Sequence, residues 1–217
     1  MLPWLSHSKA SLGLDFLFGL KQPLVSLGMA RLLNLEDVRK FEKLVEKHAQ
    51  TLESLEFIVS TEGDAKNGLE IQLPALPNLQ DLDFSVHRGY DKVNRSYAMV
   101  ILTFPGDTGI VNYKAHLPSI RTIRIVPYNE VSGQKSWEKY GNFFDTFLPK
   151  KVTSSNQQEV CTTLKRLYIP YKIGEDPEIP YPRVAELAGM FPNVGKKFMT
   201  KFTNLAAIRA GMIEKEN

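Results

Sequence analysis

The chain has 217 residues, 43% hydrophobic and 24% charged, a composition typical of a folded globular protein and not of a disordered one. Its 27 basic and 24 acidic residues give a net charge of +3, and this excess lies entirely in the last 23 residues, from Gly195 onward, so the rest of the chain shows no general nucleic-acid signature. The single cysteine, Cys161, excludes an internal disulfide framework and a cysteine-based zinc cluster.

A short phrase recurs along the chain: an apolar residue, two variable residues, an apolar residue, one variable residue and a final apolar residue. Its alternating end places two apolar side chains on one face of a short strand. One such strand cannot bury its apolar face alone, so the units are expected to stack. The five clear copies are 24–29, 52–57, 79–84, 120–125 and 164–169, and degenerate copies lie near 12–16 and 194–199.

The spacing of the copies indicates a repeat architecture. Their middle apolar residues are Leu27, Leu55, Leu82, Ile123 and Leu167, which are 28, 27, 41 and 44 positions apart. The first two spacings lie in the range of leucine-rich repeats, and insertions stretch the later two. A proline precedes three copies, at Pro77, Pro118 and Pro192, and ends whatever structure comes before it.

Helical patterns lie between the strands. The segment 36–48 places apolar residues on one stripe, with Asn34 as its N-cap. Aromatic residues recur at helical spacing over 137–147, and we assign them to packing against the sheet, the alternative being a partner groove. Further helices are predicted to begin at Ser136, Pro182, and Thr203 or Asn204.

The remaining segments are read as loops or stay ambiguous. Polar stretches at 61–69, 150–158 and 170–182 predict loops. The apolar run 97–104 fits either a strand or a helix. The glycines of 104–109 lack the lysine and spacing of a phosphate-binding loop and therefore predict a turn.

Alternating short strands and helices predict an α/β fold. We expect an irregular leucine-rich-repeat solenoid, with short parallel strands on its concave face and helices on its convex face. The whole chain, 1–217, forms one domain in this prediction, and 200–217 is a basic cap at its C-terminal end.

The repeat region, roughly 24–199, resembles the leucine-rich repeats of F-box/leucine-rich-repeat proteins. The likeness rests on helices that run directly into a threonine-leucine strand start, at Thr51-Leu52 and Thr163-Leu164, and on the proline-prefixed strands. The resemblance implies a non-catalytic module that recognises the substrate protein of a ubiquitin ligase. No F-box precedes the first phrase in this sequence, so a ligase adaptor is implied as a partner only if an F-box exists upstream.

Alternation also predicts which strand residues face away from the core. In stacking order these outward positions change from small residues, to acidic ones, to basic ones with an aromatic residue. They begin at Ser26 and Gly28, include Thr122, and extend to Lys196 and Phe198 if the degenerate copy at 194–199 also forms a strand. We therefore expect a protein-binding surface on the concave face. Its predicted residues are Ser54, Glu56, Asp81, Asp83, Arg124, Arg166 and Tyr168. The alternative is a solvated face in which Asp83 and Arg124 simply pair across strands.

Other kinds of function find less support in the sequence. Neither Cys161 nor the four histidines show the spacing of a catalytic or metal site, so we expect no enzyme activity, no cofactor and no metal. An α/β enzyme without a visible motif remains an alternative, as does nucleic-acid binding through Lys196, Lys197 and Lys201 with the neighbouring phenylalanines. Without a secretory signal or an apolar span, we expect no membrane partner and an intracellular protein, cytoplasmic or nuclear.

Overall fold

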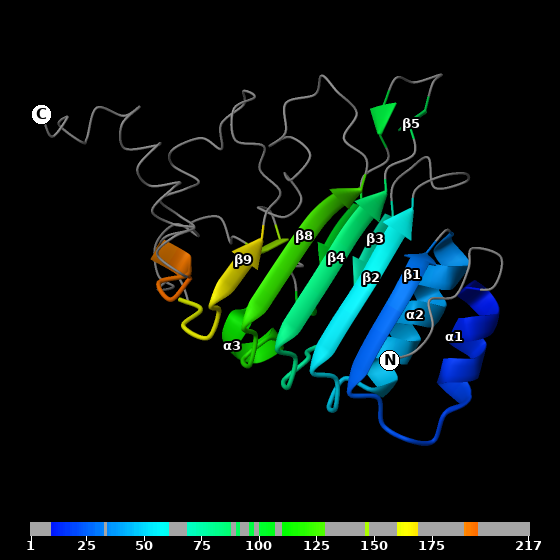
Figure 1. Cartoon of the computed structure of the whole chain (residues 1–217), viewed down its shortest axis with the longest axis horizontal. Helices are drawn as coiled ribbons and strands as arrows, with labels where there is room; N and C mark the ends of the chain where they lie inside the picture. Colours follow the sequence, from blue (N-terminus) through cyan, green and yellow to red (C-terminus); the bar gives the residue numbers. More distant parts are fainter. Residues whose placement is uncertain are drawn as a thin grey trace, which may run out of the picture.

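A computed structural model describes residues 10–32, 34–60, 69–87, 90–91, 96–97, 100–106, 110–128, 146–147, 160–168 and 189–194. These residues form a mixed α/β fold with mostly parallel strands and few helices (Figure 1). A five-stranded parallel sheet has the order β1-β2-β4-β8-β9. Its strands are β1 (Ser26–Leu32), β2 (Ser54–Ser60), β4 (Asp81–His87), β8 (Thr122–Tyr128) and β9 (Arg166–Tyr168).

The five copies of the phrase supply these five strands. The middle apolar residues pair in one continuous row across the sheet, from Leu27 through Leu55, Leu82 and Ile123 to Leu167. All five are at most 3% exposed. The prediction that the phrase forms parallel strands with a shared buried face is confirmed.

The predicted strand starts are two residues too early. Each strand begins at the third residue of its phrase, because the first residue lies in the turn ahead of the sheet. That first residue is nevertheless fully buried at Leu52, Leu79, Ile120 and Leu164. Four strands also extend beyond the end of the phrase, so that they are seven residues long.

The same backbone contact starts four of the five strands. At β2 the N–H groups of Glu53 and Ser54 both donate to the carbonyl of Val25, at 2.7 and 3.2 Å. The equivalent pairs at β4, β8 and β9 donate to Glu53, Gln80 and Arg121. Because each strand start is hydrogen-bonded to the second phrase residue of its neighbour, this contact is consistent with the register in which the two strands pair.

Polar side chains directly before the phrases connect neighbouring units. Asn78 Nδ2 donates to the carbonyl of Gln50 at 2.7 Å, and Asn193 Nδ2 donates to that of Thr162 at 2.6 Å. Both carbonyls lie two residues ahead of the preceding phrase. The turn 191–194 therefore contacts the β9 unit as the turn 76–79 contacts the β2 unit. This agrees with a further phrase beginning at the buried Val194, whose remaining residues lie outside the described ranges.

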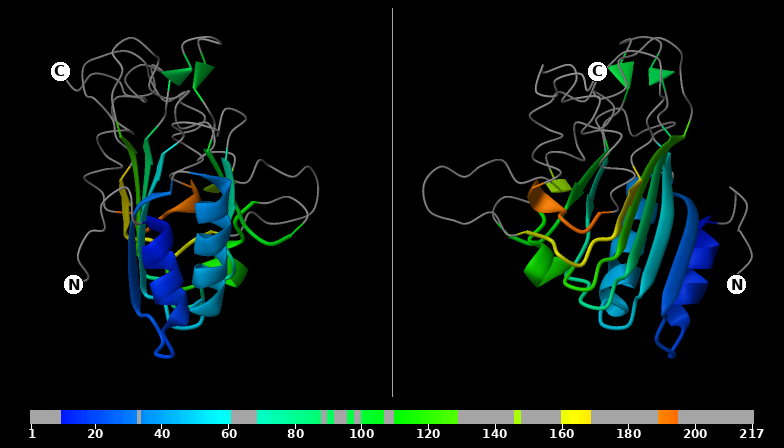
Figure 2. Two further views of the ribbon diagram at one scale, coloured as in Figure 1. Left: turned by 90° about the vertical axis from the view of Figure 1, so that its right-hand side faces the viewer. Right: turned by 60° about the vertical axis from the view of Figure 1, so that its left-hand side comes forward.

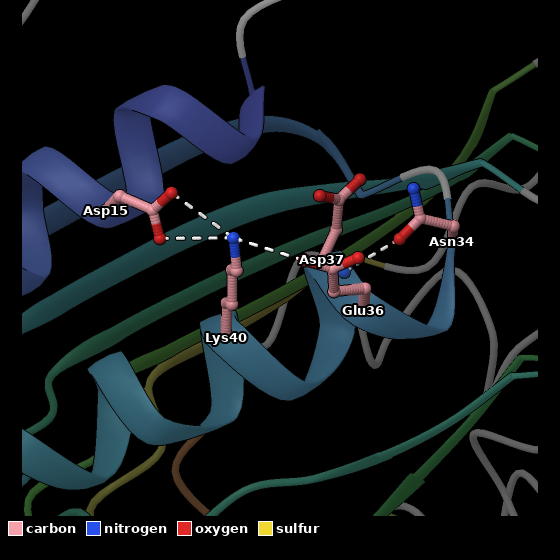
Figure 3. Close-up of polar contacts among 5 residues, drawn as sticks. All are labelled: Asp15, Asn34, Glu36, Asp37 and Lys40. Atoms are coloured by element: carbon pink, nitrogen blue, oxygen red, sulfur yellow. Dashed lines mark hydrogen bonds and ion pairs between the residues drawn. The ribbon is translucent and has the colours of Figure 1, made fainter.

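A second layer covers one face of the sheet (Figure 2). Its main helix is α2 (Leu35–Lys47), within one residue of the prediction. The Asn34 side chain caps it by accepting the N–H of Asp37 at 2.8 Å, as Figure 3 shows. The apolar stripe of α2 is buried as predicted, at Val38, Phe41, Leu44 and Val45.

Helix α1 (Ala10–Gly19) packs against α2. Lys40 Nζ lies 3.1 Å from Asp15 Oδ1 of α1 and 3.3 Å from Glu36 Oε1 of α2 (Figure 3). Lys47 also reaches α1, where it donates to the carbonyl of Phe18 and lies 5.1 Å from the centroid of that ring. The suggested degenerate strand copy at 12–16 is wrong, because this segment is helical.

In the described residues the second layer contains strands as well as helices. The prediction that only helices cover this face of the sheet is therefore wrong for these residues. β3 (Leu69–Gln72) pairs in parallel with β7 (Val100–Thr103). β3 begins at residue 69, where the predicted loop 61–69 ends. β7 shows that the apolar run 97–104, which fitted either a strand or a helix, contains a strand. The other short elements are the antiparallel pair β5 (Tyr90–Asp91) and β6 (Ser96–Tyr97) and the helix α3 (Tyr113–His116).

The core lies between the two layers. Phe57 of β2 contacts Phe41 of α2 and Phe84 of β4, with ring centroids 4.9 and 5.1 Å apart. Further along the sheet, Tyr113 packs edge-on against Phe191 with centroids 5.4 Å apart. Near β2 the aromatic residues therefore join helix α2 to the sheet. Near α3 they join two chain segments that are far apart in the sequence.

Several predicted elements lie outside the described ranges. They are the helices beginning at 136, 182 and 203 apart from a few residues, the loops at 150–158 and 170–182, and the basic cap at 200–217. Of the predicted aromatic stripe, Phe147 is described and is buried, as core packing requires. Among the described residues, no helix has the length and apolar character needed to cross a membrane.

Candidate functional site

The predicted site residues lie in two rows across the sheet. One row runs from Ser26 and Ser54 through Asp81 and Thr122 to Arg166. The next runs from Gly28 and Glu56 through Asp83 and Arg124 to Tyr168. Both rows alternate with the buried row of Leu55 and its partners, so they occupy the opposite face of the sheet. We call this face, with its two rows, the charged face.

The charged face is accessible. Glu56, Asp81, Arg124 and Arg166 are exposed, and Ser54 and Asp83 are half-buried. No described helix or strand covers it, because α1, α2, α3 and the β3–β7 pair lie on the other side (Figure 2). For Tyr168 the structure describes the strand position, opposite Arg124.

The charged face has an open hollow of about 440 Å³ over β2, β4 and β8. Five of the residues that line it are Ser54 and Glu56 from β2, Asp81 and Asp83 from β4, and Arg124 from β8. Leu82 and Thr122 complete the lining. The hollow thus brings together five of the seven predicted site residues, and leaves Arg166 and Tyr168 on β9 beside it.

At the centre of the face, Asp83 and Arg124 pair across β4 and β8. Arg124 Nη1 lies 3.5 Å from Asp83 Oδ2, with side chains 56% and 29% exposed. Burial raises the pKa of the Asp83 carboxyl, and the neighbouring Arg124 only partly offsets this by lowering it. The predicted cross-strand pair therefore exists, but it does not fully compensate the desolvation of Asp83.

The Asp83→Asn substitution is expected to leave the free energy of unfolding at pH 7 unchanged or to raise it by up to about 1 kcal/mol. It removes a desolvated charge, and an ion pair this exposed contributes only about 0–1 kcal/mol. Because the native pKa of Asp83 lies above its ordinary value of 3.8, any gain is present above the native pKa and disappears as the pH falls toward 3.8.

Urea denaturation between pH 7 and pH 4 measures this difference. The matched control is Asp81→Asn on the same strand, which changes an exposed side chain and should alter stability by less than about 0.5 kcal/mol. A loss of more than about 1 kcal/mol for Asp83→Asn at pH 7 would show instead that the pair with Arg124 outweighs burial.

Sequence reasoning missed a third row, at the second phrase position. It contains Glu53, Gln80, Arg121 and Lys165, each directly ahead of its strand. Gln80 Nε2 lies 3.4 Å from Glu53 Oε2, so neighbouring members of this row contact each other. Alternation alone assigns this position to the buried face, but the chain is still turning there and the side chains stay outside. The signal was present in the sequence, because the row repeats the charge order of the other two.

The remaining candidates behave as structural residues. Cys161 is 3% exposed, with its Sγ 3.5 Å from Thr163 Oγ1. His48 and His116 are buried and accept the backbone N–H groups of Leu24 and Asn112 through Nδ1, and burial lowers the pKa of both. In the part of the chain that the structure describes, no group of His, Cys, Asp and Glu side chains is arranged to hold a metal ion.

Two further predictions meet the structure only in part. Gly106 has φ +120°, as the predicted turn at 104–109 requires, although 107–109 lie outside the described residues. The basic segment with Lys196, Lys197 and Lys201 lies wholly outside them.

The chain was compared with models of known protein families, with characterised proteins and with solved structures. None of these comparisons finds a match. The candidate site is therefore defined by its geometry: a charged sheet face, hollowed over β2, β4 and β8, with an incompletely compensated carboxylate at its centre.

Proposed function

We propose that the chain is an irregular leucine-rich-repeat solenoid that acts as a non-catalytic protein-binding module through its charged face. Its role would resemble that of the substrate-recognition repeats of an F-box ubiquitin-ligase receptor. The repeat interpretation is supported by the in-register phrases and by the contacts that recur between neighbouring units, such as those of Asn78 and Asn193.

The observation that carries the binding role is the accessible charged face with its hollow. The hollow offers three carboxylates and one guanidinium but no described nucleophile–base arrangement, which favours recognition over catalysis. Arginine on such a face is also a residue type that often dominates protein interfaces. The nucleic-acid alternative rests on the basic tail and gains no support from the face, whose two rows hold three acids and two bases.

The test is affinity capture from the source organism with a double charge reversal, Asp81→Lys with Arg166→Glu. This variant keeps the net charge and alters two exposed positions, so its stability should stay within about 1 kcal/mol of the parent. A partner held by the charged face should bind it at least tenfold more weakly.

The matched control reverses one acid and one base on the exposed side of α2, Glu46→Lys with Lys43→Glu. It should retain the partner fully. If both variants capture the same proteins as the parent, the charged face is not the binding site and the proposal fails.

A further inference from the structure

Across the two rows of the charged face and the third row ahead of the strands, the charge changes sign once, between β4 and β8. β2 carries Glu56, with Glu53 directly ahead of it, and β4 carries Asp81 and Asp83. β8 carries Arg124, with Arg121 directly ahead of it, and β9 carries Arg166, with Lys165 directly ahead of it. The corresponding positions of β1 are Val25, Ser26 and Gly28, which carry no charge. At these three phrase positions the formal charges from β1 to β9 are therefore zero, minus two, minus two, plus two and plus two, and β1 also holds Arg31 beyond its phrase.

Pairing within the face leaves most of these charges available. Among the described residues, Asp83 with Arg124 is the single ion pair on the face, and it lies at the change of sign. Glu56 and Asp81 on one side, and Arg166 on the other, have no ion-pair partner within the described ranges. Mutual neutralisation for solubility thus explains the centre of the face but not its two ends.

The hollow crosses the change of sign, because its lining comes from β2, β4 and β8. A ligand seated in it would meet the carboxylates of β2 and β4 at one end and the Arg124 guanidinium at the other. A polyanion such as RNA would be repelled by β2 and β4, and a polycation by β8 and β9. The complementary ligand is one that carries both signs in the opposite order.

The spacing of the strands limits the form of that ligand. Adjacent strands lie about 4.8 Å apart, so the centre of the acidic pair of strands is about 10 Å from that of the basic pair. In an α-helix, residues seven positions apart lie on one face and are separated by about 10 Å, at 1.5 Å per residue. In an extended segment, residues on one face are about 7 or 13 Å apart, which fits less well.

Resting on the proposed function, we propose that the partner presents an α-helix that lies across the strands, with basic side chains over β2 and β4 and acidic side chains about seven residues away over β8 and β9. The incompletely compensated carboxylate of Asp83 lies beneath the middle of this helix. A basic side chain of the partner near it would supply the compensation that Arg124 alone does not.

The test uses two synthetic helical peptides of identical composition and zero net charge. The block peptide carries its lysines on one half of one helix face and its glutamates on the other half, seven residues away. The control peptide has the same residues with alternating signs along that face. Binding to the whole isotope-labelled chain is followed by amide chemical shifts at low salt and again at 0.5 M NaCl, where charge interactions are screened.

The block peptide is expected to shift amides of the charged face, Glu53, Glu56, Asp81, Arg121 and Lys165 among them. It should bind at least tenfold more tightly than the alternating peptide, and it should weaken at least tenfold in high salt. Asp81→Lys with Arg166→Glu cancels the charges at β4 and β9 and should weaken the preference between the peptides, whereas the control reversal on α2 should keep it in full.

Equal affinity for both peptides, or no shifts on the face, would overturn the inference. So would a second copy of the chain on this face, seen as concentration-dependent shifts of the same amides without peptide, or an RNA oligonucleotide that shifts them. If the captured partner depends on the charged face while the peptides fail, the proposed function stands and the helix inference falls. If the captured partner ignores the charged face, the proposed function itself falls.

Discussion

Replacing Phe57 with alanine is expected to lower the free energy of unfolding by about 3–5 kcal/mol. This loss is a large part of the total free energy of unfolding of a domain of this kind. Phe57 is fully buried at the centre of the β2 strand. Its ring joins Phe41 of α2 to Phe84 of β4, so truncation opens a cavity between helix and sheet. Urea denaturation followed by far-ultraviolet circular dichroism measures the loss.

Two further variants identify the cause. Phe57→Leu keeps much of the volume and should cost clearly less than alanine. Phe16→Ala removes the same ring from a position that is 68% exposed on α1 and should change stability by less than about 0.5 kcal/mol. A loss below about 1 kcal/mol for Phe57→Ala would contradict the described packing between α2 and the sheet.

Replacing Tyr113 with alanine should cost a similar amount, about 3–5 kcal/mol, at the other end of the core. The side chain is buried, its hydroxyl donates to the carbonyl of Phe147 at 3.1 Å, and its ring packs edge-on against Phe191. Burial raises the pKa of Tyr113, so the hydroxyl remains a donor throughout the neutral range. One residue thus joins segments 34 and 78 positions away in sequence.

A local measurement distinguishes the loss of the Tyr113 contacts from a general loss of stability. Hydrogen exchange of the Val194 amide, which bonds to the Phe191 carbonyl, should accelerate more in Tyr113→Ala than exchange in β2. Tyr113→Phe keeps the ring and removes only the hydrogen bond, and should cost about 1–3 kcal/mol. Equal costs for the alanine and phenylalanine variants would show that the ring contact with Phe191 contributes nothing.

The five-stranded sheet was predictable because its phrase combines two independent signals. Alternation decides which side chains are buried, and repetition of the phrase decides which residues become neighbours, as in the row from Leu27 to Leu167. The helix at 35–47 was predictable because the cap at Asn34 and the stripe through Phe41 agree. The outward positions of the charged face followed directly from the same alternation.

The second layer was much less predictable. In β3 only Leu69 and Ile71 face inward, and its partner β7 begins at Val100, so no local pattern indicates the pairing. Helix α1 is apolar on nearly every side, with Phe16 exposed and Leu14 and Leu17 buried, so it lacks the amphipathic period that marks a surface helix.

Within the candidate site, alternation could identify side chains but not the shape around them. The hollow depends on how Ser54, Glu56 and Thr122 are spaced in three dimensions, which the phrase does not encode. The row of Glu53, Arg121 and Lys165 was missed for a different reason, because a strict two-residue period assigns the turn residue ahead of each strand to the wrong face.

The unequal chain lengths between strands have a consequence for how this protein varies. From Leu55 to Leu82 there are 27 positions and from Leu82 to Ile123 there are 41, yet both pairs occupy the same register. Lengthening a connection costs little loop entropy, since the cost grows only logarithmically with length. Connections can therefore gain or lose residues while every side chain of the sheet keeps its neighbours. Position within the phrase, and not distance along the chain, is the coordinate in which relatives of this protein should be aligned.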